Sequence, residues 1–190
     1  MERKIHHLIF EGAELAGKSW LMSQVYDYVE PKYNKNKIIL DGCHWFNCDV
    51  GVYGTKHGKP VINSYLKIFK ELQNKNLLIE KFHLSDKVYN KLHNNKSVNY
   101  KPVEQILKKL NFKIVLVVFP ENKDLLKKRI QDRLSLYPHY ERILKNPGWY
   151  IRQQKEYLKE INKTLLPHLI IKTDRLPDNN LVKAILDWIE

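Results

Sequence analysis

The most informative segment of the chain reads Gly12-Ala13-Glu14-Leu15-Ala16-Gly17-Lys18-Ser19, and its spacing is G-x-x-x-x-G-K-S. In loops of this type, glycines let backbone N–H groups wrap phosphates, the lysine reaches the β and γ phosphates, and the serine hydroxyl ligates Mg²⁺. Lys18 and Ser19 hold those two positions. The segment therefore predicts a loop that binds the phosphates of a nucleoside triphosphate, with all eight residues in contact with them.

The residues on either side of this loop support the same interpretation. Residues 5–10 are apolar enough for a buried parallel strand, and residues 18–29 have the periodicity of a helix. The helix would bury one face, formed by Leu21, Met22, Val25 and Val29. Strand, loop and helix thus follow one another in the order that phosphate binding requires.

Apolar runs rich in β-forming residues alternate with helical periodicity along the whole chain. The expected strands are 5–10, 37–40, 77–80, 113–119 and 169–172, and the expected further helices are 60–74, 85–92, 102–110, 122–134, 149–165 and 180–188. Within this set we expect Ser85 to cap the helix that begins there. Such alternation predicts an α/β fold with a five-stranded parallel sheet flanked by helices.

Length and composition favour one cytoplasmic domain. A chain of 190 residues with 43% hydrophobic residues suits a single core spanning 1–190. Two cysteines, no targeting segment and no long apolar run predict a protein of a reducing compartment without membrane association. The net charge of +12 would favour binding of a polyanion, but the lysines are spread along the chain and form no local basic stripe. We therefore keep nucleic acid as a possible substrate and do not predict a dedicated nucleic-acid-binding face.

Two long stretches lack a clear period and are rich in Gly, Asn, Pro and aromatic residues. They are residues 41–59 and 135–148, and both would follow elements that end on the phosphate-loop side of the sheet. Ligands bind at that edge in open α/β sheets. We interpret the first as a substrate loop and the second as part of a lid that covers approximately 133–148.

The phosphate loop, together with residues 80–89, resembles thymidylate kinase and its deoxynucleoside kinase relatives. The resemblance implies a three-layer P-loop fold of the nucleoside monophosphate kinase type, with a lid, that uses ATP and Mg²⁺. Glu14 matches the carboxylate at the third loop position of that family. It is therefore expected to place the acceptor nucleotide, near the sugar 3′ hydroxyl, beside the donor phosphates.

The second matching motif follows the third expected strand. The resemblance makes Glu80 the acid of this motif, which would hold Mg²⁺ or take a proton from an acceptor hydroxyl. Lys81 stands where the family has arginine, which grips phosphate with two parallel donors. The expected substrate contacts of this region are Lys81, Phe82, Ser85 and Tyr89.

Charge stabilisation during transfer would come from the lid. Leu15 is apolar, so the phosphate loop supplies no arginine of its own. Arg129 and Arg133 lie one helical turn apart and can project toward the same phosphates. The expected catalytic residues are therefore Lys18, Glu80, Arg129 and Arg133.

The acceptor pocket departs from the family. After the second strand, thymidylate kinases carry Arg-x-Pro and deoxynucleoside kinases carry Glu-Pro, whereas this chain has Asp41-Gly42-Cys43-His44-Trp45-Phe46-Asn47. Trp45 is a candidate to stack on a base.

Three functions are open on the sequence. The first is transfer of the γ-phosphoryl group of ATP to a deoxynucleoside monophosphate, in the manner of thymidylate kinase. The second is transfer to a hydroxyl of a nucleoside or polynucleotide with Glu80 as base, and the third is nucleotide binding without catalysis. The resemblance also makes a homodimer one expectation.

Overall fold

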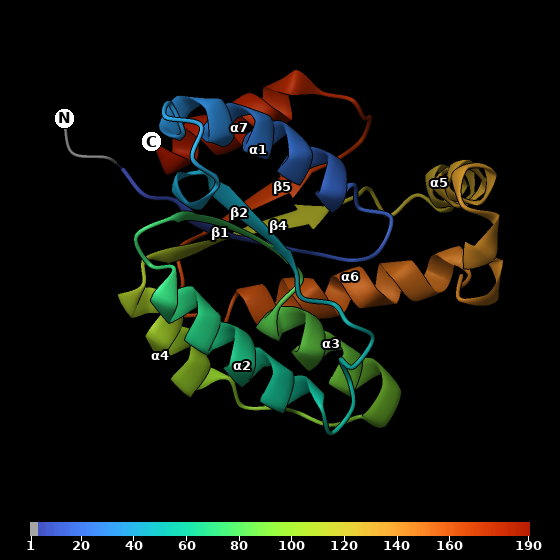
Figure 1. Cartoon of the computed structure of the whole chain (residues 1–190). Helices are drawn as coiled ribbons and strands as arrows, with labels where there is room; N and C mark the ends of the chain where they lie inside the picture. The colour runs from blue at the N-terminus through green and yellow to red at the C-terminus, as the bar shows by residue number, and fades with distance from the viewer. Residues whose placement is uncertain (1–3) are drawn as a thin grey trace.

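A computed structural model describes residues 4–190 and contains a five-stranded, all-parallel sheet (Figure 1). The strands are β1 (His7–Glu11), β2 (Cys43–Asn47), β3 (Asn76–Glu80), β4 (Phe112–Val118) and β5 (His168–Lys172). Their order across the sheet is β2-β3-β1-β4-β5. The α/β class and the five-stranded parallel sheet expected from the sequence are confirmed.

Helices cover both faces of the sheet. They are α1 (Lys18–Tyr33), α2 (Gly58–Glu71), α3 (His83–Asn94), α4 (Lys101–Lys109), α5 (Lys123–Leu136), α6 (Pro147–Ile161) and α7 (Asn179–Ile189), with short 3-10 helices η1 (Ile39–Asp41) and η2 (Pro138–Arg142). In Figure 1, α1 and α7 lie on one face of the sheet and α2, α3, α4 and α6 on the other. The α5 helix lies apart, beyond the edge of the sheet where the β1–α1 loop is found.

The three inner strands are apolar because both of their faces are covered. Every residue of β1 and β3 is buried, and β4 is buried except at its second residue. A strand buried on both faces has no polar face, so it appears in the sequence as a continuous apolar run. This is why the sequence located β1, β3 and β4 to within two residues.

The expected strand at 37–40 is wrong. That segment leads into η1, and the side chains of Ile38 and Ile39 are 51% and 86% exposed. The actual second strand, β2, lies inside the stretch that we took as a loop. It is an edge strand in which half-buried and exposed positions alternate after the buried Cys43, so it has no apolar run to mark it.

Most helices begin and end within four residues of their expected bounds, but the start of α3 differs in kind. Ser85 is the third residue of this helix rather than its cap. The start of α3 is instead held by Glu11, whose Oε1 accepts hydrogen bonds from the backbone N–H groups of Phe82, Leu84 and Ser85. The carboxylate of a residue on β1 thus takes the place of an N-cap side chain and satisfies the free N–H groups at the start of the helix.

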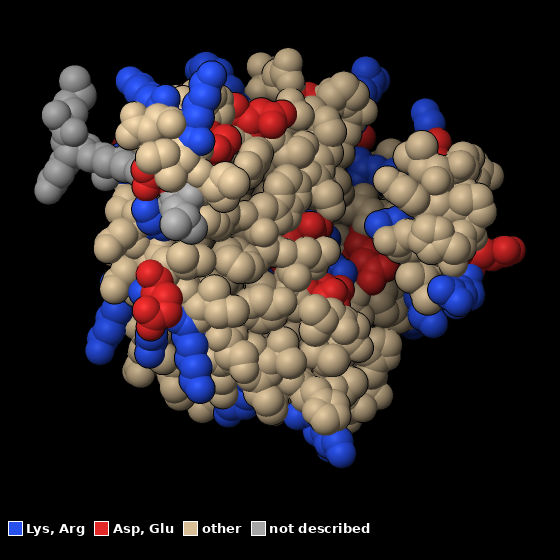
Figure 2. Space-filling view, in the orientation of Figure 1, with Lys and Arg blue, Asp and Glu red and all other residues tan. Residues whose placement is uncertain are grey.

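The region expected to form a lid contains the end of α5, all of η2 and the first residues of α6. Figure 2 shows a hollow between the body of the molecule and this lobe, with acidic and basic side chains gathered in it. Across residues 4–190, no helix combines the length and apolar character needed to span a membrane.

Candidate functional site

The phosphate loop joins β1 to α1 and depends on left-handed backbone. Gly12, Leu15 and Gly17 have φ values of +137°, +65° and +85°. A Cβ atom on Gly12 would lie 2.1 Å from the carbonyl oxygen of Val117 on β4. Only glycine fits there, so the first glycine of the motif sets how closely the loop lies against the sheet.

Lys18 is buried beneath this loop. Its Nζ donates hydrogen bonds to the carbonyl oxygens of Gly12, at 2.9 Å, and Ala13, at 2.8 Å. Burial, and then the positive charge of Lys81, lowers the pKa of Lys18 from 10.5 to about 8, although Glu80 and Glu14 act in the other direction. Burial disfavours the charged ammonium, and anionic phosphate oxygens would stabilise it more strongly than these two neutral carbonyl oxygens do.

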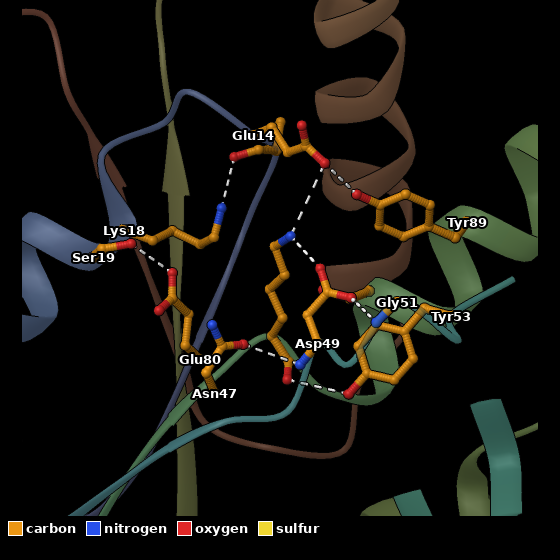
Figure 3. Close-up of polar contacts among 12 residues, drawn as sticks. Glu14, Lys18, Ser19, Asn47, Asp49, Gly51, Tyr53, Glu80 and Tyr89 are labelled. Atoms are coloured by element: carbon orange, nitrogen blue, oxygen red, sulfur yellow. Dashed lines mark hydrogen bonds and ion pairs between the residues drawn. The ribbon is translucent and has the colours of Figure 1, made fainter. Parts of the chain in front are cut away.

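Ser19 and Glu80 lie together, as expected for two ligands of one metal ion. The Ser19 Oγ atom donates a hydrogen bond of 2.7 Å to Oε1 of Glu80, which is the last residue of β3 (Figure 3). A hydroxyl and a carboxylate are hard oxygen donors of the kind that Mg²⁺ prefers, and Mg²⁺ in phosphate sites commonly keeps only one or two carboxylate contacts. The donor set therefore fits Mg²⁺, which would neutralise charge on the triphosphate.

A second polar group lies beside the phosphate loop, and we call it the carboxylate–lysine cluster: Glu14, Asp49, Lys81 and Tyr89. Tyr89, on α3, donates a hydrogen bond of 2.6 Å to Oε1 of Glu14. The ammonium of Lys81 lies 2.5 Å from Oδ2 of Asp49 and 4.0 Å from Oε1 of Glu14. Figure 3 shows that the phosphate loop, the segment after β2 and α3 each bring a side chain to this place.

Asp49 and Lys81 hold each other in their charged forms. Burial disfavours the ionised carboxyl of Asp49, but the Lys81 ammonium outweighs it, so the pKa of Asp49 lies below its usual value. Burial also disfavours the charged form of Lys81, yet Tyr89, Asp49 and Glu14 together raise its pKa. Lys81 itself has φ +57°, a conformation that non-glycine residues seldom adopt and that is often found at functional sites.

Two of the expected substrate contacts lie in the interior instead. Phe82 is 0% exposed and its ring packs 5.4 Å from that of Phe69. Ser85 is also 0% exposed, and its Oγ contacts Glu11 at 2.5 Å and Tyr157 at 2.7 Å. The described contacts of both side chains are therefore those of core packing and of the α3 start.

Trp45 is not part of the carboxylate–lysine cluster either. It lies in the middle of edge strand β2, 38% exposed, with its ring 6.0 Å from that of Tyr26 on α1. The loop that follows β2 reaches the cluster through Asp49.

The two expected lid arginines differ in their contacts. The Arg129 guanidinium donates to the carbonyl oxygen of Leu15, at 2.9 Å, and to that of Thr173, at 2.5 Å. It thereby ties α5 to the phosphate loop and to the segment after β5. Arg133 lies with its guanidinium carbon 4.4 Å from the ring centre of Tyr140 in η2.

Sequence reasoning missed several residues that shape this site. Asp49 follows a strand that the sequence misplaced, so it was not recognised. Glu11 and Gln153 are almost fully buried, and Gln153 Oε1 accepts a 3.0 Å hydrogen bond from the backbone N–H of Glu14. The available signal for Glu11 was an acid at the end of a fully apolar strand, directly before the phosphate loop.

The sequence matches no protein-family model and no curated protein. Solved structures do share the fold. The YorR protein from Bacillus subtilis, solved in complex with phosphorylated GDP, aligns with a TM-score of 0.66 at 17% identity, over 96% of this chain and 94% of its own. Thymidylate kinase from Ehrlichia chaffeensis aligns with a TM-score of 0.58 at 12% identity, over 98% and 99%. Deoxyadenosine kinase from M. mycoides, solved with the products dCMP and dCDP, aligns with a TM-score of 0.55 at 15% identity, over 96% and 98%. The chain thus has the three-layer fold of P-loop kinases.

Proposed function

We propose that this protein is an ATP-dependent phosphotransferase whose acceptor is a nucleoside or a nucleotide. The observation that carries the proposal is the position of Glu14. It belongs to the phosphate loop, yet its carboxylate contacts Tyr89 and lies 4.0 Å from Lys81. The loop that would bind the donor triphosphate therefore also contributes a side chain to the neighbouring place where an acceptor would bind. A protein that only holds a triphosphate has no need for such a polar group beside it.

The donor half would work through positioning and charge. Lys18 would exchange its contacts with Gly12 and Ala13 for phosphate oxygens, and Ser19 with Glu80 would hold Mg²⁺. Arg129 would keep the loop in place through the carbonyl oxygen of Leu15. Arg133, on the same helix, is proposed to approach the transferred group when the lid closes and excludes water.

The acceptor has two forms that differ in chemistry. A monophosphate is already largely anionic at pH 7, because its second pKa is about 6, and needs no base. A hydroxyl acceptor needs one, and Glu80 at the end of β3 is the candidate. The thymidylate kinase-like monophosphate form follows from the place of Glu14 in the loop.

The charges of the carboxylate–lysine cluster favour the hydroxyl form. Lys81 is the cation that would receive an acceptor phosphate, but Asp49 lies 2.5 Å from it and Glu14 lies 4.0 Å from it. Two carboxylates and one ammonium leave a net charge of −1, which repels a phosphate and accepts hydrogen bonds from hydroxyl groups. On the charges of this cluster we therefore place the nucleoside hydroxyl first and the monophosphate second.

A transfer assay separates these forms. The purified protein is incubated with γ-labelled ATP, Mg²⁺ and a panel of nucleosides, nucleoside monophosphates and short oligonucleotides. We expect label on at least one nucleoside, weaker or no label on the matching monophosphate, and no label with Lys18→Ala. A monophosphate as the preferred acceptor would reverse our order of the two forms. Binding of ATP with no label on any acceptor would leave the non-catalytic alternative.

A further inference from the structure

A pocket of about 870 Å³ lies away from the phosphate loop. The phosphate loop precedes the first residue of α1, whereas this pocket is lined by the last two turns of α1, the segment that follows and the first residues of β2. The lining residues that bear on ligand binding are Tyr26, Glu30, Asn34, Lys35, Lys37 and Trp45. The volume is within the range of small-molecule sites.

One wall of the pocket is aromatic. Trp45 is 38% exposed although it is a large apolar residue, and its ring is inclined by 47° to that of Tyr26 at a centroid distance of 6.0 Å. An indole that is this exposed beside a second ring offers aromatic surface on which a planar ring can stack.

A second wall carries a carboxylate. Glu30 lies there, with Oε1 accepting a 2.7 Å bond from Asn34 Nδ2 and Oε2 accepting from the backbone N–H of Cys43. A Cβ atom on Gly42 would lie 2.6 Å from a Glu30 oxygen, so this wall depends on a glycine. A ligand group that donates N–H bonds complements the Glu30 carboxylate, which lines the pocket and whose oxygens can each accept a further hydrogen bond.

The third feature is a pair of cations. Lys35 and Lys37 line the pocket and their side chains are exposed. Within the described part of the chain, neither of them forms an ion pair. Two unpaired ammonium groups beside a stacking face attract a planar ligand that carries an anion.

We infer that this pocket binds a nucleotide whose base carries an amino group. The base stacks on Trp45, its amino group donates to Glu30, and its phosphate lies between Lys35 and Lys37. This site is separate from the phosphate loop, and the inference does not depend on the proposed kinase activity.

The test follows Trp45 directly, so that binding here is not confused with binding at the phosphate loop. Protein labelled with 5-fluorotryptophan gives one ¹⁹F signal for each of its four tryptophans, and Trp45→Phe identifies the signal of interest. The titration uses Lys18→Ala protein, in which phosphate-loop binding is impaired. CMP and UMP form a matched pair of the same size: cytosine carries the amino group, whereas uracil has a carbonyl oxygen there and an N–H at the neighbouring ring nitrogen.

We expect CMP to shift the Trp45 signal in a saturable way and UMP to bind at least about fivefold more weakly. The double variant Lys35→Gln/Lys37→Gln should weaken CMP binding by about tenfold or more. The control Lys67→Gln/Lys70→Gln removes two exposed lysines of α2 and should leave binding unchanged.

Three results would overturn the inference. The first is a Trp45 signal that does not move at millimolar CMP. The second is equal binding of CMP and UMP, which removes the role of the amino group. The third is equal loss of affinity in the two lysine double variants, which would reduce the effect to general surface charge.

Discussion

The Oγ atom of Ser19 and the Oε1 atom of Glu80 are 2.7 Å apart, although 61 residues separate them in the chain. Ser19 lies in the first turn of α1 and Glu80 ends β3, which is the neighbour of β1 in the sheet. The order of the strands therefore places the acid of the second motif against the hydroxyl of the first. This contact turns two separate sequence motifs into one site.

Replacing Glu80 by Gln tests the function of this contact. The amide keeps the shape and can still bond to Ser19, but it carries no charge and is a poor base and a poor metal ligand. We expect kcat to fall by about 10²- to 10⁴-fold while the thermal midpoint changes little. Steady-state kinetics with a nucleoside acceptor measures this, and Glu71→Gln on the exposed end of α2 is the control. Activity within a factor of two of wild type would remove Glu80 from both of its proposed roles.

The lowered pKa of Lys18 predicts how the free energy of unfolding depends on pH. Its pKa falls from 10.5 in the unfolded chain to about 8 in the fold, which corresponds to roughly 3 kcal/mol against the charged form. Below pH 8 both states are protonated and the fold bears this cost. Between pH 8 and 10.5 the unfolded chain binds more protons, so this group makes the protein more stable as pH rises.

Lys18→Met removes that cost together with the two hydrogen bonds of Nζ. We expect the variant to be catalytically inactive yet to have the higher free energy of unfolding at pH 7, with the difference from wild type shrinking between pH 8 and 10. Denaturant titrations at several pH values measure this, and Lys67→Met, at an exposed position, should show no such trend. A difference that is independent of pH would contradict a depressed pKa for Lys18.

Arg129 and Arg133 make different contacts, so we expect their replacement to have different effects. Arg129 joins the carbonyl oxygens of Leu15 and Thr173 with a planar fork that lysine cannot reproduce. We expect Arg129→Lys to raise the KM for ATP and to lower kcat/KM by about tenfold or more, because the phosphate loop loses a support. Arg133→Lys keeps its charge near Tyr140 and should raise the KM for ATP much less. Equal effects of the two changes on this KM would show that the loop contacts of Arg129 are of no consequence.

The sequence could predict the parts of the fold that depend on local pattern. The inner strands and all seven α-helices were found because buried strands are continuous apolar runs and because amphipathic helices have a period. Strand β2 could not be found in this way, because Cys-His-Trp-Phe-Asn contains no run of aliphatic residues, whereas the other edge strand, β5, carries Leu169-Ile170-Ile171 and was located to within one residue. Ile38 and Ile39 formed a more apolar run but lie exposed.

The residues of the site also differ in whether a local motif or the tertiary structure determines their place. Lys18, Ser19 and Glu80 follow from motifs whose spacing reflects their chemistry, and the structure brings them together. Phe82 and Ser85 belong to a motif too, but the direction of their side chains, just before α3 and in its first turn, is decided by packing against the core. Asp49 has no motif and depends on where β2 ends, so its pairing with Lys81 became visible only in three dimensions.

Asp49→Asn tests that pairing through acceptor choice. The change removes one of the two carboxylates that neutralise Lys81, so the carboxylate–lysine cluster goes from a net charge of −1 to zero. We expect the affinity for a nucleoside monophosphate to rise by about five- to tenfold, since a single charge at this distance contributes on the order of 1 kcal/mol in a partly solvated site. The affinity for the matching nucleoside should not rise. Calorimetric titration with both ligands measures the difference, and Asp187→Asn on exposed α7 serves as a control of equal charge change. If both Asp variants bind the monophosphate with the same affinity, Asp49 does not set the charge of the acceptor site.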